Sequence, residues 1–410
     1  MTKFLKLTCF VSIILMAGCT KDKTQQIKEQ SAETQKQVNA AGITFSPASG
    51  INFTAVTING SFSTTPGANV VKFNGVTGII NSVSANKIVV TVPATATTGK
   101  VSVTTNSITT TSSTDFKVLK LVKERSFTTN FYISKLSFDR SGNGVTYALT
   151  PTGVNKIAAN GAISTLYDSP PVSYPKYYAL RGFDNDGLGN VYITRVLYKD
   201  STYTIPPDVI NTTTRLLSSV VLKINAAGQA TKLLGDGLRK TLDGLSPLMI
   251  DAKGQNLVLA YADKSTPLLR VSRSGALQNI SGLSPVNDFC LDKDDNFYTI
   301  LNGKLSKVNT AGVATYLCGK GGEGQKDGPA DVATLTLPQG IIVDGAQNIL
   351  MLNAYYAFRV VNTAGYAGTL SVEVPDTSGS NAMYFNRFTN KIYIIGGSQS
   401  GGLIHQYAIK

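Results

Sequence analysis

The stretch Phe289–Leu317, FCLDKDDNFYTILNGKLSKVNTAGVATYL, decides the fold. Its first apolar run ends at Asp292, a short polar turn follows, and a second apolar run begins at Phe297. A third run carries Lys307, and another turn leads into a fourth run. Asp, Asn and Gly suit tight hairpin turns, because they tolerate positive φ and bond to their own backbone. The stretch therefore predicts four antiparallel strands joined by short turns.

The same pattern recurs along the chain from Leu119 onward. In each copy an acid or amide starts the turn after the first apolar run; these residues are Asp139, Asp186, Asp251, Asp292, Asp344 and Asn386. Consecutive copies are 47, 65, 41, 52 and 42 residues apart. Four strands in a unit of about 40–50 residues is the signature of propeller blades. We predict a six-bladed β-propeller over residues 119–410.

A different pattern fills residues 43–118. Ile88, Val90 and Val92 are apolar at every second position before a proline, and turn pairs such as Asn74-Gly75 recur about every ten residues. Period-2 alternation with regular turns predicts a small antiparallel sandwich. The fold class we expect is all-β, with a sandwich followed by the propeller.

Two segments resemble known families. The pieces FSPASG, VTINGSFS, VKFNG and IVVTVP, in this order within residues 45–93, resemble an IPT/TIG domain, which implies an immunoglobulin-like fold that acts as a spacer or interaction module. Residues 318–352, CGKGGEGQKDGPADVATLTLPQGIIVDGAQNILML, resemble an NHL repeat, which implies the same propeller architecture.

The N-terminus has the pattern of an export signal. Lys3 and Lys6 precede an apolar run that is too short to span a bilayer and ends in Met16-Ala17-Gly18-Cys19. Small residues before a cysteine resemble the bacterial lipobox, so we expect residues 1–18 to be removed and Cys19 to be lipidated. The alternative is a plain signal peptide with an incidental cysteine.

Residues 19–42 have almost no large apolar side chains and are expected to form a flexible tether. Lys21-Asp22-Lys23 resembles the charged tracts that send Bacteroidetes lipoproteins to the cell surface. We therefore expect an outer-membrane lipid anchor with the protein at the cell surface; a protein that faces the periplasm is the alternative.

The charge of the chain excludes few partners. Lys and Arg number 38 against 25 Asp and Glu, a net charge of +13, but the cations are scattered. A basic solvated surface is the better interpretation, and without a nucleic-acid-binding motif we expect no nucleic acid partner. Beyond the signal and the anchor only Cys290 and Cys318 remain, and their predicted places three strands apart within one blade are too distant for a disulfide.

Several patterns that could carry chemistry have a structural interpretation instead. Gly319, Gly321 and Gly324 have the spacing of a dinucleotide-binding loop, but Pro329 and Pro338 prevent the helix that such a loop needs. We assign the glycines to a loop between blades. Two Asp-rich stretches, 184–187 and 292–296, lack the later ligands of a calcium loop and are predicted to be turns.

The single histidine, His405, is expected to occupy a position in the last strand and not a catalytic triad. We predict no catalytic residue, no metal and no cofactor. A metal-dependent, lactonase-like hydrolase stays as an alternative, because sugar-lactonase propellers bind a metal in the central channel through Glu, Asp and Asn.

The insertions of the repeat point to a binding face. Turns between strands one and two and between strands three and four of each blade are short and share one face, the tight-turn face. The opposite, long-loop face receives every insertion; these are Tyr167–Leu180, Arg195–Ser219, Leu234–Pro247, Cys318–Pro338 and Pro375–Ala382. Variable loops on a rigid frame are a usual place for binding.

Tyrosines and arginines gather in these insertions. The candidate ligand-binding residues are Tyr174, Tyr177, Tyr178, Arg181, Arg195, Tyr198, Tyr203, Tyr355 and Tyr356. Tyrosine offers an apolar face and a hydroxyl, which suits sugar rings or a protein partner. The alternative is that these tyrosines only pack the long loops.

Bacteroidetes lipoproteins that combine TIG and NHL segments resemble this chain throughout, and some are associated with glycan capture. The resemblance implies a non-enzymatic surface protein that binds an extracellular glycan; a scaffold for an outer-membrane protein partner is the alternative. We also predict that Val118–Phe127 supplies the outer strand of the last blade, which otherwise ends one strand short at Lys410.

Overall fold

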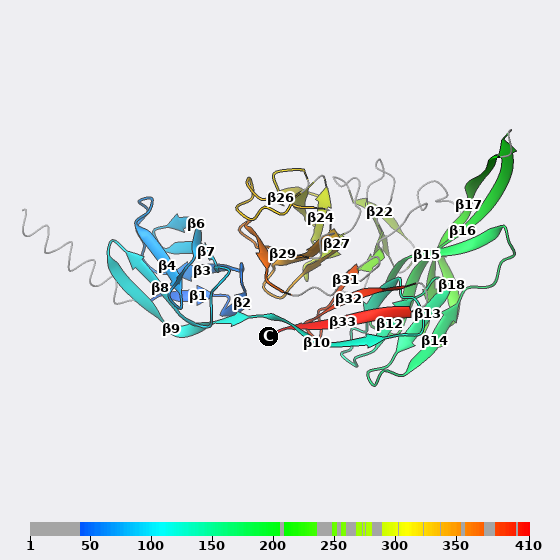
Figure 1. Ribbon diagram of the computed structural model, residues 1–410, viewed down its shortest axis with the longest axis horizontal. Helices are drawn as coiled ribbons and strands as arrows, with labels where there is room; N and C mark the ends of the chain where they lie inside the picture. The colour runs from blue at the N-terminus through cyan, green and yellow to red at the C-terminus, as the bar shows by residue number, and fades with distance from the viewer. Residues whose placement is uncertain are drawn as a thin grey trace, which may run out of the picture.

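The computed structural model describes residues 42–410 with several short gaps. The residues outside the description are 1–41, 206–208, 236–247, 252–255, 260–267, 273, 275, 281–288, 302, 323, 337, 354–356, 373–381 and 399–400. The described residues form strands and turns without a helix, which confirms the all-β prediction. A small N-terminal unit of strands lies beside a larger ring of sheets (Figure 1).

Two sheets make up the N-terminal unit. The first contains, in spatial order, β1 (Thr44–Ser46), β3 (Ala55–Asn59), β7 (Lys87–Thr91) and β6 (Ile79–Ser84). The second contains β2 (Ser49–Ile51), β9 (Ile108–Leu119), β8 (Gly99–Thr105), β4 (Asn69–Phe73) and β5 (Val76–Thr77). All neighbours are antiparallel except β2 and β9, which pair in parallel.

The predicted alternation in this unit is confirmed. Ile88, Val90 and Val92 are all fully buried and share one core with Phe73 and Phe116, whose rings meet edge to face at 5.2 Å. Side chains of a strand point alternately to its two faces, so one set of apolar residues fills the space between the two sheets. The unit is therefore a two-sheet sandwich.

Six four-stranded antiparallel sheets follow within the described residues. Each is named here by its innermost strand, and the strands run outward in chain order. The β11 sheet contains β11 (Lys135–Phe138), β12 (Thr146–Leu149), β13 (Gly153–Ile157) and β14 (Ile163–Asp168). The β15 sheet contains β15 (Lys176–Asn185), β16 (Val191–Ile205), β17 (Val209–Ile224) and β18 (Ala230–Leu234). The β19 sheet contains β19 (Leu248–Ile250), β20 (Asn256–Leu259), β21 (Leu268–Ser272) and β22 (Leu277–Ile280).

The other three sheets repeat this order. The β23 sheet contains β23 (Phe289–Leu291), β24 (Phe297–Leu301), β25 (Lys304–Val308) and β26 (Ala314–Cys318). The β27 sheet contains β27 (Pro338–Val343), β28 (Ile349–Asn353), β29 (Phe358–Val361) and β30 (Ala367–Leu370). The β31 sheet contains β31 (Ala382–Asn386), β32 (Lys391–Ser398), β33 (Gly401–Ile409) and, out of chain order, β10 (Leu121–Thr128). The inner strands of these sheets all line one channel. A ring of four-stranded sheets around a central channel is a β-propeller.

The repeated acids start turns, as predicted. The Asp292 carboxylate accepts hydrogen bonds from the backbone N–H groups of Asp294 and Asn296, both at 2.9 Å, and from the Asn296 side chain. Asp344 is bonded in the same way by Ala346 and Asn348. These acids hold the hairpin between the first two strands of their sheets.

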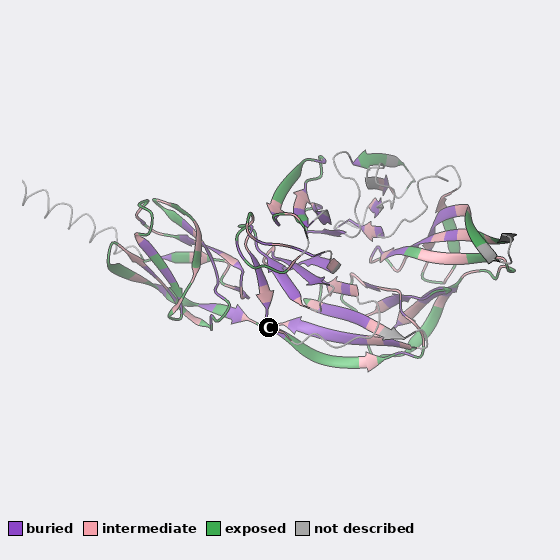
Figure 2. Ribbon diagram, turned by 45° about the horizontal axis from the view of Figure 1, so that its top comes forward, coloured by how far each residue is buried: buried purple, intermediate pink, exposed green. Residues whose placement is uncertain are grey.

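The outer strand of the β31 sheet comes from the other end of the propeller chain, which confirms the predicted closure. β10 pairs antiparallel with β33 from Leu121 opposite Ile409 to Thr128 opposite Leu403. Figure 2 draws this mostly exposed strand along the buried β33. The strand begins three residues later than predicted, because Val118 is buried in the core of the sandwich.

The sandwich contacts the β27 sheet directly. The Phe53 ring is buried and stacks on Tyr366 with centroids 6.3 Å apart. The Asn362 side chain donates to the Phe53 carbonyl and to the Thr91 hydroxyl, both at 2.8 Å. A Cβ added to Gly368 would lie 2.4 Å from the Phe53 ring, so only glycine fits there. The sandwich is therefore packed on the tight-turn face of this sheet.

Two insertions differ from the prediction. Arg195–Ser219 was expected to be a loop, but β16 and β17 pair along it from Val191 opposite Ile224 to Ile205 opposite Val209. Tyr167–Leu180 is also partly strand, since β14 extends to Asp168 and β15 starts at Lys176. Alternating β-branched and tyrosine residues favour a strand over a loop. The result is a hairpin that projects from the ring (Figure 1).

Both remaining cysteines take their predicted places. Cys290 lies in β23 and Cys318 ends β26, and both are free and buried. Burial raises the pKa of the Cys318 thiol to about 11, so this thiol is inert at neutral pH.

Candidate functional site

A channel runs along the innermost strands of all six sheets. It encloses about 480 Å³, a volume in the range of small-molecule pockets. Its wall is mainly apolar; among the residues that form it are Leu136, Phe183, Met249, Phe289, Ile341 and Met383.

The two ends of the channel differ in how many charged residues line them. Lys135, Pro338 and Ala382 line it where their strands begin, toward the long-loop face. Charged residues line it where the inner strands end, toward the tight-turn face; these are Arg140, Asp184, Asp292, Lys293, Asp344 and Arg387. Since each follows or ends an inner strand, the polar mouth opens on the tight-turn face.

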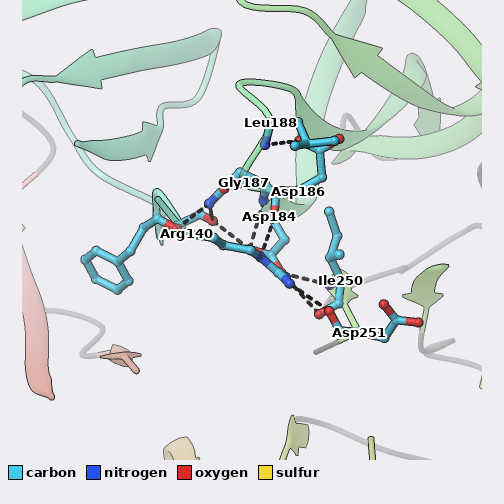
Figure 3. Close-up of polar contacts among 10 residues, drawn as sticks. Arg140, Asp184, Asp186, Gly187, Leu188, Ile250 and Asp251 are labelled. Carbon is cyan, nitrogen blue, oxygen red and sulfur yellow. Dashed lines mark hydrogen bonds and ion pairs between the residues drawn. The ribbon is translucent and has the colours of Figure 1, made fainter. Parts of the chain in front are cut away.

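Arg140 crosses between three sheets at this mouth (Figure 3). Its Nε donates to the Asn185 carbonyl at 3.1 Å, and its two terminal nitrogens donate to the carbonyls of Asp251 at 2.7 Å and Ile250 at 3.0 Å. The guanidinium is also 3.5 Å from the Asp184 carboxylate. Arg140 therefore ties the β11, β15 and β19 sheets together.

Asp184 is held as firmly as its arginine partner. One carboxylate oxygen accepts from the Ser137 hydroxyl at 2.6 Å and from the Asn185 N–H, and the other accepts from the Ile250 N–H at 2.7 Å. A Cβ at Gly187, whose φ is +72°, would lie 2.5 Å from the Arg140 side chain. The absence of a side chain at Gly187 therefore lets the turn after β15 lie against Arg140.

The two other acids of the mouth belong to their own turns. Asp292 has no exposed side-chain surface and lies 3.4 Å from Lys307. Burial alone would raise the pKa of its carboxyl, but hydrogen bonds from Asn296 and Asp294 and the charge of Lys307 leave it lowered. At Asp344 burial outweighs similar hydrogen bonds and raises the pKa. Both carboxylates are thus occupied within the protein.

Sequence reasoning missed this cluster, although a signal existed. Arg140, Lys293 and Arg387 each follow the turn-starting residue of their repeat. Aligning the repeats at that residue would have placed three cations at one mouth. Arg140 and Arg387 are 387 − 140 = 247 positions apart in the sequence. A motif relates residues that are close in sequence, so it could not show that these cations lie together.

The predicted tyrosines lie mainly on the projecting arm, defined here as residues 176–181 and 195–218. Tyr177 pairs across the strands with Tyr198, and their rings stack with centroids 5.5 Å apart. Tyr177 is 41% exposed and Tyr174, just before the arm, is 82% exposed. Tyr198 is half-buried, so the stacked pair has one exposed ring, which can receive a flat apolar face of a ligand.

The other face of the arm holds Arg195 between two tyrosines. The Arg195 guanidinium lies 4.6 Å from the centre of the Tyr178 ring and donates to the Tyr167 hydroxyl at 2.9 Å. Tyr167 is buried. Tyr178 and Arg195, two of the predicted residues, therefore pack the arm against the β11 sheet, as the alternative interpretation of the tyrosines expected.

The remaining predicted residues are not brought into this arrangement. Arg181 is exposed. Tyr203 lies in β16, and nothing is described of its side chain. Tyr355, Tyr356 and the predicted lipidation residue Cys19 lie outside the described residues.

His405 occupies β33, as predicted, and is 4% exposed. Its Nδ1 is 2.7 Å from the Ser126 hydroxyl, while its Nε2 is buried without a hydrogen-bond partner in the described structure. Burial lowers the pKa of the imidazole. The contact fixes β10 to β33 and resembles an interstrand pair more than a nucleophile and its base.

The glycine-rich segment forms a loop between the β23 and β27 sheets. Gly319 donates to the Ala330 carbonyl at 3.0 Å, and Gly328 and Ala367 exchange two backbone hydrogen bonds. Asp327 accepts from the backbone and hydroxyl of Thr369. No helix follows the glycines in the described residues, so the prediction of an inter-blade loop is confirmed.

The described residues contain neither a metal-binding cluster nor a membrane-spanning helix. No group of three or more His, Cys, Asp or Glu side chains is placed to hold a metal ion there. In the same part of the chain, no helix is long and apolar enough to span a membrane.

No protein-family model matches the sequence, and no curated protein is similar to it. Solved structures are similar in shape. One is a protein of unknown function from Bacteroides thetaiotaomicron, with 16% identity, a TM-score of 0.48, and 90% of this chain and 98% of that chain covered. An auxiliary nutrient binding protein from the same organism has 13% identity, a TM-score of 0.46 and the same coverage.

A gluconolactonase from Xanthomonas campestris has 13% identity and a TM-score of 0.44, with 71% of this chain and 90% of that chain covered. Scores and identities this low carry no argument about function. The β-propeller rests on the sheet topology described above.

Proposed function

We propose that this protein is a non-enzymatic lipoprotein that binds an extracellular glycan on the long-loop face of its propeller. In this proposal Cys19 is lipidated and holds the protein at the outer membrane, facing the outside of the cell. Residues 43–118 form an immunoglobulin-like IPT/TIG domain, and residues 119–410 form a six-bladed, NHL-like propeller.

The observation that carries the binding proposal is the stacked pair of Tyr177 and Tyr198. Both rings stand on strands, whose backbone hydrogen bonds fix their positions. The apolar face of a sugar ring stacks on such an aromatic surface, while hydroxyl groups bond to the phenolic oxygens. Tyr174, largely exposed beside the arm, can extend the surface.

A glycan array with the purified protein tests this proposal. Tyr177→Ala and Tyr198→Ala should each weaken binding to the best glycan at least tenfold. Phe388→Ala is the matched control, because Phe388 is also an exposed aromatic residue, at 46%, but lies on the tight-turn face. Equal loss in the control, or binding that is unchanged in both tyrosine variants, would overturn the placement.

The array also separates the proposal from its rivals. No binding to any glycan on the array, together with saturable binding to a purified outer-membrane protein, would favour the scaffold. Turnover of lactones that stops on metal removal would favour a hydrolase. For the anchor, Cys19→Ala should abolish labelling with radioactive palmitate and release the protein from membranes.

A further inference from the structure

A cation without a protein partner stands at the polar mouth of the channel. Arg387 lines the channel and is exposed. Among the described residues no acid lies within ion-pair distance of its guanidinium, whose nearest ring is that of Phe388 at 5.9 Å. The positive charge of Arg140 acts against its guanidinium charge, while the more distant carboxylates of Asp184, Asp295 and Asp251 favour it without pairing with it.

The acids that line the channel form no ion pair with Arg387 and are hydrogen-bonded elsewhere. Asp184 accepts three hydrogen bonds and faces Arg140. Asp292 and Asp344 are buried in their turns, where amide groups satisfy both carboxylates. Of the other cations at this mouth, Arg140 donates to three carbonyls and Lys293 pairs with Asp294 at 2.8 Å. Arg387 is the group left to meet a ligand.

The channel beside Arg387 suits an apolar body. Phe385, Phe388 and Tyr384 come from the same strand and turn, Ile341 comes from the neighbouring β27 sheet, and Phe289 comes from the β23 sheet beyond it. Apolar surface that leaves water in such an enclosed space is stabilised by about 25 cal/mol for each Å² buried. The volume of about 480 Å³ lies in the range of pockets that bind small organic molecules.

We propose that the tight-turn mouth of the channel binds a small organic anion, whose carboxylate pairs with Arg387 and whose apolar chain or ring enters the channel. A guanidinium presents parallel N–H donors that match a carboxylate, which makes Arg the fitting residue. This site lies on the opposite face from Tyr177 and Tyr198. It does not depend on the proposed glycan binding.

An exposed arginine is usually only solvated, so the test must separate the two cases. The probes are 4-phenylbutyrate, its neutral counterpart 4-phenylbutanol and the sugar acid glucuronate, with binding to the full chain measured by calorimetry. We expect saturable binding of 4-phenylbutyrate and at least tenfold weaker binding of the alcohol and of glucuronate. Arg387→Gln should weaken the binding of 4-phenylbutyrate at least tenfold, and Arg387→Lys should retain part of it.

Lys293→Gln is the matched control, since Lys293 also lines the mouth but is paired with Asp294; its variant should weaken binding much less than Arg387→Gln does. Melting curves of the three variants check that the fold is intact. The proposal is overturned by failure of 4-phenylbutyrate to bind, by equal affinity for the alcohol, by binding of glucuronate alone, or by an equal loss in Lys293→Gln. Glycan binding through the arm should persist in Arg387→Gln, so failure here leaves the proposed function standing.

Discussion

The β27 and β15 sheets are built on the same repeat but meet opposite surroundings. Every residue of β28 and β29 is buried, because the sandwich covers one end of this sheet and the loop of residues 319–336 covers another part. The first six residues of β15 are exposed or half-buried, and β16 and β17 extend past the ring. The difference shows that the repeat determines where the strands form. The sandwich and the insertions between strands determine which sheet is covered and which is exposed to solvent.

The largest effect is expected from removing what holds the ring closed. Deletion of residues 1–128 removes the sandwich and β10, and exposes the edge of β33, a strand in which six of nine residues are buried. We expect a protein that fails to fold or melts lower by about 10 °C or more, since several kcal/mol are lost. Scanning calorimetry provides the measurement. A deletion variant that melts like the full chain would mean that β10 does not close the propeller.

A single residue should break the contact between the sandwich and the β27 sheet. Phe53→Ala removes the ring that stacks on Tyr366 and fills the space above Gly368. Truncation of a buried Phe costs about 3–5 kcal/mol. Urea unfolding should therefore show a lower midpoint or a separate transition for the sandwich. Ile163→Ala, a substitution at a 45% exposed position, is the control and should change stability little.

The closure should also depend on pH through Glu124. Hydrogen bonds from Lys391, Lys410 and Gln406, together with the charge of Lys391, lower the pKa of this carboxyl from 4.5 to about 2. A lowered folded-state pKa stabilises the protein above the unfolded value of 4.5, and this contribution disappears as the pH falls toward 2. Glu124→Gln should melt lower than the wild type at pH 7, and the two melting temperatures should converge below pH 4.5. A constant gap across that range would rule out this linkage.

The smallest effect is expected at the arm. Replacing residues 199–215 by Asn-Gly shortens the β16–β17 hairpin beyond Tyr198, where its described residues are mostly exposed or half-buried. Few buried contacts are lost, so the melting temperature should change by no more than about 2 °C. Circular dichroism measures it. A large drop would show that the arm stabilises the ring and is not merely presented by it.

Much of the fold follows from local patterns in the sequence. The acids at Asp186, Asp292 and Asp344 mark turns because carboxylates bond to nearby N–H groups, and this rule needs only neighbouring residues. The closing strand could be predicted because an incomplete sheet leaves an unpaired edge at its end. The arm was mistaken for a loop, although the alternation around Tyr203 carried a strand signal.

The sites depended on contacts that local patterns do not contain. Arg140, Lys293 and Arg387 are brought together only when the ring closes. Among the predicted tyrosines, sequence could not separate Tyr177, which faces solvent, from Tyr178, which lies under Arg195. Adjacent strand residues point to opposite faces, and which face is covered depends on the neighbouring sheet.

Hydrogen–deuterium exchange in the presence of the best glycan from the array tests the central claim most directly. The claim is that the held β27 sheet supports the ring while the arm receives the ligand. We predict slower exchange at Lys176–Leu180 and Arg195–Lys199, and no change at Ile349–Asn353 or in the sandwich. Protection confined to the sandwich or to the β27 sheet would contradict the account and place the ligand on the opposite face.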